Sequence, residues 1–254
     1  MKYFLPDGTE ITAKEFVKRY SEDYFLKEIG KKGLVPDLDR NSEYIEKEIE
    51  KILHKGIKDE RDVARIIAWK IAKIKHRESE DNQEFRYASD WVNAEQLSVT
   101  RYSKPFPLEK IAHDITNNIE NLEKLAVEDP QGLLNAINKS EYKGMGSVYL
   151  VTLLYFLSKG EYPIYDQFAM MSLTAIISGV SPIPGEKVAV DVKFKELPPK
   201  DSIKFSEIMK NEMAQYIKML NEIFDDEWKT NRKIDQALWV YGHLFKEGKK
   251  TPCG

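Results

Sequence analysis

Cysteine is almost absent from this chain, since Cys253 is the only one among 254 residues. A single thiol cannot build a disulfide framework, a structural zinc site or a four-cysteine iron–sulfur cluster within one chain. Histidine is also scarce, and none of the four histidines pairs with another at the spacing that metal ligands take on a helix. We therefore expect no metal and no cofactor.

The chain also lacks a long hydrophobic run. The longest, Val148–Leu157, has ten residues and includes the polar Thr152. That length is too short to cross a bilayer and is typical of a buried helix. The opening residues, MKYFLPDGTE, have no signal-peptide core. We expect a cytoplasmic protein without a membrane partner.

Positive charge is not in excess either, because the formal net charge is −3 at pH 7. This balance argues against a protein that binds nucleic acid through bulk charge. It is compatible with a local cationic face. Hydrophobic residues make up 42% and charged residues 32%, which is the composition of a folded globular protein.

Helical periodicity dominates what is present. Residues 3–11 read as a small hairpin around Pro6-Asp7-Gly8, and Thr12 with Glu15 has the spacing of a helix capping box. The predicted helices cover residues 12–24, 42–54, 59–74, 108–127, 130–139, 147–158, 166–178, 202–224 and 231–246.

Three segments break the helical pattern. Residues 30–41 are predicted as a loop. Residues 76–106 are the least regular part, and 91–107 is either a surface connector or a loop across a cleft. Alternating valines predict a short strand at 188–194.

The predicted fold class is mainly α, with minor β elements near 3–11 and 188–194. The chain is expected to form a single helical unit. A possible division into two lobes is residues 1–105 with 200–254 and residues 106–180, with 181–199 as a β-like insertion.

The two glycines of Gly144-Met145-Gly146 directly precede the apolar helix predicted at 147–158. Glycine lets backbone N–H groups approach a ligand closely, and the first turn of a helix has unpaired N–H groups that attract anions. Lys143 and Ser147 flank the glycines with a charge and a hydroxyl. The segment is either a phosphate site or a tight turn between helices.

Asp166 follows the extended segment Tyr162-Pro163-Ile164-Tyr165. Its structural role would be to cap the helix that begins at Gln167. Its chemical role would be a general base, or a carboxylate that stabilises a cationic transition state. The spacing alone favours the cap.

Together these residues resemble the helix-hairpin-helix DNA glycosylase superfamily, and the resemblance implies a helix-hairpin-helix glycosylase-like helical fold. The resemblance covers residues 131–166: helix Gln131–Lys139, hairpin Ser140–Gly146, helix Ser147–Ser158 and the element Pro163-Ile164-Tyr165-Asp166. It implies that the hairpin residues Lys143, Gly144, Gly146 and Ser147 hold a DNA phosphate. It also implies that Asp166 drives cleavage of the base–sugar bond in damaged duplex DNA.

The chain departs from this family at informative positions. Val148 stands where bifunctional members carry the Schiff-base lysine, and valine cannot act as a nucleophile. Tyr165 is one residue more than the usual step from proline to aspartate, and Leu150 replaces a small residue. The resemblance therefore implies either a hydrolytic, monofunctional N-glycosylase or a relative that has lost the reaction.

A base flipped out of the stack needs aromatic or apolar walls. Tyr149, Trp91, Tyr102 and Phe168 are candidates for these walls, although the sequence favours an ordinary core position for each of them. The alternative function is a non-catalytic helical module that binds nucleic acid or a protein partner.

Overall fold

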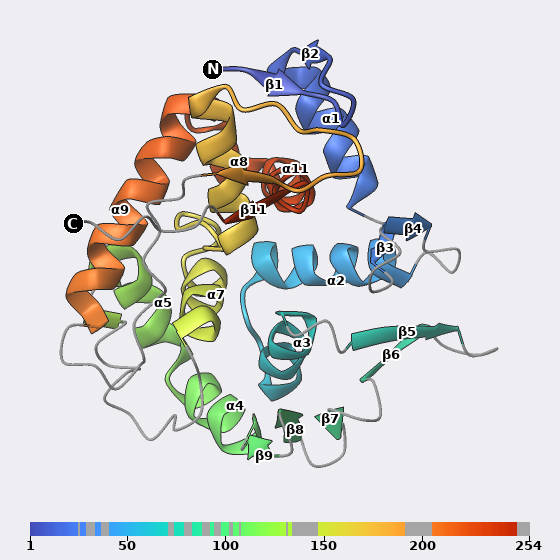
Figure 1. The fold of residues 1–254 in the computed structure, drawn as a ribbon. Coiled ribbons are helices and arrows are strands. Elements are labelled where there is room, and N and C mark those ends of the chain that lie inside the picture. Colours follow the sequence, from blue (N-terminus) through green and yellow to red (C-terminus); the bar gives the residue numbers. More distant parts are fainter. Residues whose placement is uncertain are drawn as a thin grey trace. The chain divides into compact units, whose positions relative to one another are not determined.

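The structure is a computed structural model. It describes residues 1–24, 26–28, 34–36, 41–70, 74–78, 83–87, 92–93, 98–101, 104–106, 108–130, 132–133, 147–190 and 205–247. Over these residues the chain is mainly helical, as its periodicity predicts (Figure 1).

The chain divides into two compact units, each described by itself. Unit 1 comprises Met1–Pro36, Pro163–Glu196 and Ile208–Gly254, and unit 2 comprises Asp37–Tyr162 and Leu197–Glu207. The division into lobes drawn from the sequence stays a prediction.

Unit 1 contains five helices and three strand pairs among the described residues. The helices are α1 (Ala13–Asp23), α8 (Gln167–Ser178), α9 (Phe205–Phe224, whose first three residues fall in unit 2), α10 (Glu227–Thr230) and α11 (Arg232–Gly242). The strands are β1 (Tyr3–Phe4), β2 (Glu10–Ile11), β3 (Leu26–Glu28), β4 (Leu34–Pro36), β10 (Val188–Val190) and β11 (Phe245–Glu247).

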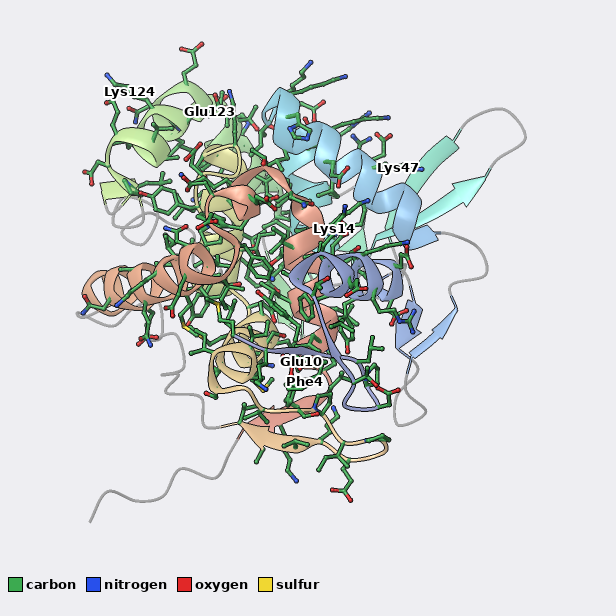
Figure 2. All side chains as sticks on the ribbon, turned by 90° about the horizontal axis from the view of Figure 1, so that it is seen from above. Phe4, Glu10, Lys14, Lys47, Glu123 and Lys124 are labelled. Atoms are coloured by element: carbon green, nitrogen blue, oxygen red, sulfur yellow. The ribbon has the colours of Figure 1, made fainter. Side chains whose placement is uncertain are left out.

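The predicted N-terminal hairpin and capping box are confirmed. Strands β1 and β2 pair antiparallel, with Phe4 opposite Glu10, next to α1 (Figure 2). The Thr12 hydroxyl accepts a hydrogen bond from the Glu15 N–H at 3.3 Å, and the Glu15 carboxylate accepts one from the Thr12 N–H at 2.9 Å. These bonds satisfy donors that the first turn of a helix leaves unpaired.

Helix α11 packs against both α1 and α8. On the α1 side, the rings of Phe16, Tyr20 and Tyr241 form a buried cluster with centroids 5.0–5.1 Å apart. On the α8 side, the Ser172 hydroxyl donates a hydrogen bond to the Leu238 carbonyl. Gly242 allows the closest approach, because a Cβ there would lie 2.0 Å from the Phe168 carbonyl oxygen.

Unit 2 is built around the apolar helix α7 (Ser147–Leu157), which packs against α2, α3 and α5. Its other described helices are α2 (Asn41–Lys55), α3 (Glu60–Lys70), α4 (Leu108–Asn117) and α5 (Ile119–Glu128). Its described strands are β5 (Ile74–Glu78), β6 (Gln83–Tyr87), β7 (Val92–Asn93), β8 (Ser98–Arg101) and β9 (Lys104–Phe106). Leu150, Leu153 and Leu154 are buried, which confirms that α7 is a core helix.

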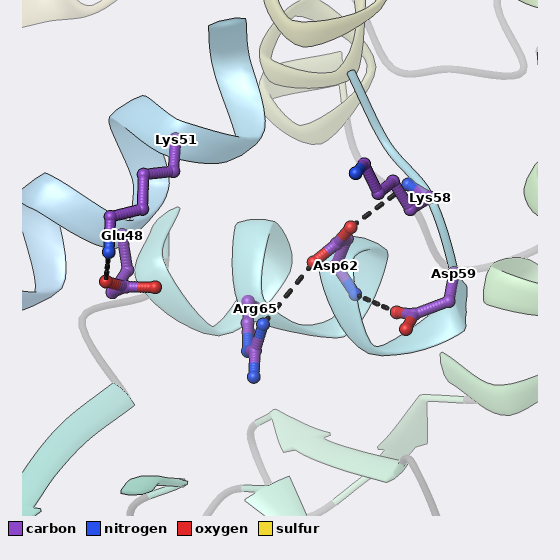
Figure 3. A network of polar contacts seen from close by, with 6 residues as sticks. All are labelled: Glu48, Lys51, Lys58, Asp59, Asp62 and Arg65. Atoms are coloured by element: carbon purple, nitrogen blue, oxygen red, sulfur yellow. Dashed lines mark hydrogen bonds and ion pairs between the residues drawn. The ribbon is translucent and has the colours of Figure 1, made fainter. Parts of the chain in front are cut away.

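The start of α3 near Asp59 is also confirmed. The Asp59 carboxylate accepts a hydrogen bond from the Asp62 N–H at 3.0 Å, and the Asp62 carboxylate accepts one from the Lys58 N–H at 3.0 Å (Figure 3). Arg65 pairs with Asp62 at 3.4 Å on the first turns of the helix. Carboxylates at a helix start accept hydrogen bonds from the unpaired N–H groups of the first turn. Their negative charge also interacts favourably with the positive end of the helix dipole.

Two helix predictions after residue 107 are wrong in length. The single helix expected over 108–127 is interrupted at Asn118, whose side-chain amide donates to the Asp114 carbonyl at 2.9 Å while its backbone leaves the helical region (φ −115°, ψ 14°). Such local side-chain bonds compete with the helix. The helix expected over 231–246 ends at Gly242, and Phe245–Glu247 pairs in parallel with Val188–Val190 instead.

Strand pairing corrects the irregular segments. The third helix was expected to reach Ile74, but Ile74 begins β5, which pairs antiparallel with β6. Strands β7, β8 and β9 form a small antiparallel sheet within 91–107, and β3 with β4 reaches into the expected loop at 30–41. Many residues of these strands are polar or charged, so no alternating apolar pattern reveals the pairings in the sequence. The helix expected at 130–139 lies mostly outside the described residues.

Candidate functional site around Asp166

Asp166 caps helix α8, as its position predicts. The preceding residues Pro163, Ile164 and Tyr165 are buried, and Asp166 keeps the extended conformation (φ −137°, ψ 139°). Its Oδ1 accepts a hydrogen bond from the Phe168 N–H at 2.8 Å. The carboxylate is partly exposed, and its direction is set by the first turn of a buried helix.

Helix α9 contributes a buried phenol that packs against Tyr165, the residue before Asp166. Tyr216 is only 1% exposed, and its ring meets the Tyr165 ring edge-on at 5.1 Å. Burial raises the pKa of Tyr216 most, the negative charge of Asp166 raises it further, and the charge of Arg232 lowers it. Tyr216 therefore packs beside Tyr165, the residue that precedes Asp166.

A continuous set of partly exposed rings begins two residues after Asp166. We call Tyr24, Phe168, Trp239 and His243 the aromatic face. His243 stacks on Phe168 with centroids 3.7 Å apart and planes 19° apart, and it also contacts Trp239 at 4.1 Å. Tyr24 extends the set by meeting Trp239 edge-on at 5.5 Å.

Polar contacts orient the aromatic face. The His243 Nδ1–H donates to the Trp239 carbonyl at 2.8 Å, which fixes the imidazole against the helix. Arg232, with 10% of its side chain exposed, forms an ion pair with Asp235 and lies over the Tyr24 ring at 5.8 Å. The aromatic face thus combines flat rings with the Arg232 cation and its ion-pair partner, the Asp235 carboxylate.

Most of the predicted hairpin residues lie outside the part of the chain that the structure describes. Lys143, Gly144 and Gly146 lie outside the described residues, and Ser147 is the first residue of α7 with an undescribed side chain. Ser147 belongs to unit 2 and Asp166 to unit 1. The phosphate site therefore stays a prediction.

Of the candidates for walls of a base site, Phe168 lies on the aromatic face and is partly exposed. Tyr149 is buried in unit 2, with 6% of its surface exposed. Trp91 and Tyr102 lie outside the described residues.

The described part of the chain contains no group of three or more histidine, cysteine, aspartate or glutamate residues arranged to hold a metal ion. Among the same residues, no helix has the length and apolar character that a membrane span needs.

Sequence reasoning missed the contribution of α9 and α11 to this region. Arg232, Trp239 and His243 are spaced by seven and four residues, so they share one face of α11, and this signal was readable. Glu212 and Tyr216 are likewise four residues apart on α9. No sequence pattern predicts that Tyr216 contacts Tyr165 or that His243 stacks on Phe168, because both contacts depend on helix packing.

Comparison with protein-family models, with curated proteins and with solved structures finds no match to this chain. Its function is accordingly inferred from its own residues.

Proposed function

We propose that this chain is a DNA-binding protein of the helix-hairpin-helix glycosylase type, and that it acts as a monofunctional N-glycosylase on a damaged base. Asp166 is the proposed catalytic residue. Lys143, Gly144, Gly146 and Ser147 are proposed to hold a phosphate of the duplex through the hairpin.

The observation that carries the proposal is the setting of Asp166. Its partly exposed carboxylate is fixed by the Phe168 N–H at 2.8 Å, and the aromatic face of Tyr24, Phe168, Trp239 and His243 starts two residues later. A flipped nucleotide is recognised by stacking on aromatic rings, and each stacked base contributes about 1–3 kcal/mol. A fixed carboxylate beside such a surface suits a reaction that develops positive charge on the sugar.

In the proposed reaction the bond between the base and C1′ of the sugar breaks, and the base leaves with the bonding electrons. The developing oxocarbenium charge is stabilised by the Asp166 carboxylate. A water molecule then forms the new bond to C1′, and its proton is transferred to the carboxylate, which returns it to solvent. Val148 occupies the position of the Schiff-base lysine of bifunctional members, so the proposed reaction includes no Schiff-base step.

The reaction is tested with duplexes that carry uracil, 8-oxoguanine or an alkylated purine, followed by alkaline cleavage of abasic sites. Asp166→Asn removes the charge, but asparagine is as good a helix cap as aspartate. We expect product formation to fall at least about a hundredfold, while duplex binding and the melting temperature are retained. Asp166→Ala is the matched variant, because it removes the cap as well and should lower stability by about 1 kcal/mol.

The rival function is a non-catalytic helical module, and the cap bond of Asp166 favours it, since that bond alone gives the residue a structural reason to be there. Wild-type protein that binds duplex DNA but releases no base from any of these substrates would support the module. Product formation that survives in Asp166→Asn would remove Asp166 from the proposed mechanism.

A further inference from the structure

The backbone N–H that bonds to the Asp166 carboxylate belongs to Phe168, and the end of helix α11 contacts this residue in two ways. The Phe168 ring stacks on His243, with centroids 3.7 Å and planes 19° apart. The Phe168 carbonyl oxygen faces Gly242, where an added Cβ would lie only 2.0 Å away. The side chain and the backbone of Phe168 thus both pack against α11, at two residues that are adjacent in the chain.

His243 is itself fixed by its own contacts. Its Nδ1–H donates a hydrogen bond to the Trp239 carbonyl at 2.8 Å, and its backbone N–H donates one to the Val240 carbonyl at 3.1 Å. The Trp239 ring lies 4.1 Å from the imidazole and 6.3 Å from the Phe168 ring. The imidazole is therefore closer to each ring than the rings are to each other, and it links Phe168 to α11.

The first turn of α8 is the part of this helix that needs such support. The N–H groups of a first turn have no partner within the helix, and helix ends open more readily than helix centres. Here the Phe168 N–H bonds to the Asp166 carboxylate at 2.8 Å, and the Met170 N–H bonds to the Asp166 carbonyl at 3.0 Å. A shift of the Phe168 backbone would move its N–H, and the direction of the carboxylate would change with it.

A flat stack restricts Phe168 more than ordinary apolar packing does. Aromatic pairs prefer particular ring geometries, and such pairs contribute free energy beyond the burial of their surface. The stack therefore fixes the plane of the Phe168 ring, and the side-chain torsions connect that plane to the backbone N–H. A leucine at the position of His243 would fill similar space without imposing a ring plane.

We propose that His243 is a positioning residue for Asp166, which it orients through the Phe168 ring and the Phe168 N–H. This inference rests on the proposed glycosylase function. The aromatic face then has a second task besides the stacking of a base, because the contact between Phe168 and His243 also holds the proposed catalytic carboxylate.

The test compares His243→Leu with His243→Phe in the full chain. Both variants lose the side-chain bond to the Trp239 carbonyl, but only phenylalanine can stack on Phe168. We expect His243→Leu to lower kcat on the most reactive of the three lesion duplexes about tenfold, with KM within about twofold, because displacing a catalytic group acts on the chemical step. His243→Phe should recover most of this loss.

Leu244→Ala is the matched control. Leu244 directly follows His243, is also partly exposed, and is not part of the aromatic face. We expect unchanged kcat. The inference is overturned if Leu244→Ala lowers kcat as much as His243→Leu, or if His243→Leu and His243→Phe have equal kcat. A rise in KM with unchanged kcat in His243→Leu would overturn it too, since His243 would then act only on binding.

A second measurement does not need activity. Hydrogen exchange at the Phe168 amide reports on its bond to Asp166. The Glu15 amide, which bonds to the Thr12 hydroxyl at 3.3 Å, is the reference for the rest of unit 1. We expect exchange at Phe168 to be about threefold to tenfold faster in His243→Leu than in His243→Phe, with no difference at Glu15.

The exchange measurement separates the two proposals. If wild-type protein acts on no duplex, the proposed function fails, and exchange at Phe168 alone decides whether His243 orients the cap. Equal exchange at Phe168 in the two His243 variants, or equal acceleration at Phe168 and Glu15, overturns the positioning role.

Discussion

Asp166 combines a structural and a proposed chemical task in one side chain. A carboxylate has two oxygens, so a cap bond through Oδ1 is compatible with electrostatic action on a substrate. The cap also removes the freedom that a surface carboxylate would have. Such preorganisation is what makes a charge effective at the moment when positive charge develops.

Lys159 offers a separate prediction at the residue scale. It lies two residues after the end of α7, in the left-handed region with φ 53°, where a Cβ costs about 1–2 kcal/mol. Lys159→Gly removes that strain, offset by the greater freedom of glycine in the unfolded chain, about 0.5–1 kcal/mol. Its ion pair with Glu123 at 3.7 Å is largely exposed and contributes little. We expect a net gain of about 0.5 kcal/mol in urea unfolding.

The control for this change is Lys159→Ala, which removes the ion pair but keeps the Cβ. It should be no more stable than the wild type. A gain equal to that of the glycine variant would mean that the left-handed conformation stores no strain.

Among the elements, α8 and α11 decide where the candidate site forms. Their close approach at Gly242 brings the aromatic rings of α11 onto Phe168, at the turn that Asp166 caps. Side chains of ordinary size at this contact would separate the helices. The aromatic face is therefore a consequence of a small residue placed at the crossing.

Gly242→Ala tests this contact. The added methyl group would meet the Phe168 carbonyl oxygen at 2.0 Å, and backbone atoms cannot rotate away. Overpacking costs about 1–3 kcal/mol and outweighs the better helix propensity of alanine, about 1 kcal/mol. We expect the free energy of unfolding to fall by about 1–2 kcal/mol, together with a shifted Phe168 amide resonance.

Lys233→Ala is the control on the same helix. Lys233 is exposed, so its truncation should change stability by no more than about 0.5 kcal/mol and leave the Phe168 amide in place. Equal effects of the two substitutions would show that α11 tolerates a methyl group at the crossing.

For the whole molecule, the charge balance limits how the proposed binding of DNA can occur. A net charge of −3 provides no general attraction to a polyanion, so binding must come from a few local phosphate contacts. Each phosphate neutralised adds about −0.9 to the slope of log K against log salt concentration. We expect a slope of about −2 to −4 on a short duplex, which corresponds to a few contacts.

The hairpin is the proposed source of these contacts, so Gly146→Asp should weaken binding about tenfold or more and make the slope shallower by about one. Asn211→Asp on α9 is the control, since it adds the same charge at an exposed position with almost the same shape. If the two variants bind alike, the phosphate contacts are not made at Gly146.

Local patterns in the sequence determined much of the secondary structure. The capping box of Thr12 and Glu15, the start of α3 near Asp59, the core helix α7 and the cap at Asp166 all depend on residues a few positions apart. Hydrogen bonds and side-chain periodicity over that range can be predicted directly from the sequence. The hairpin and its resemblance to glycosylases come from the same kind of signal.

Only the tertiary structure decided what surrounds Asp166. The pairing of β10 with β11, the contact of Tyr216 with Tyr165, and the stacking of His243 on Phe168 all join segments far apart in the chain. Such contacts are selected by packing free energy summed over many side chains, and no short run of residues contains that sum. The sequence identified Asp166 as the candidate acid, but the residues around it are set by how the helices pack.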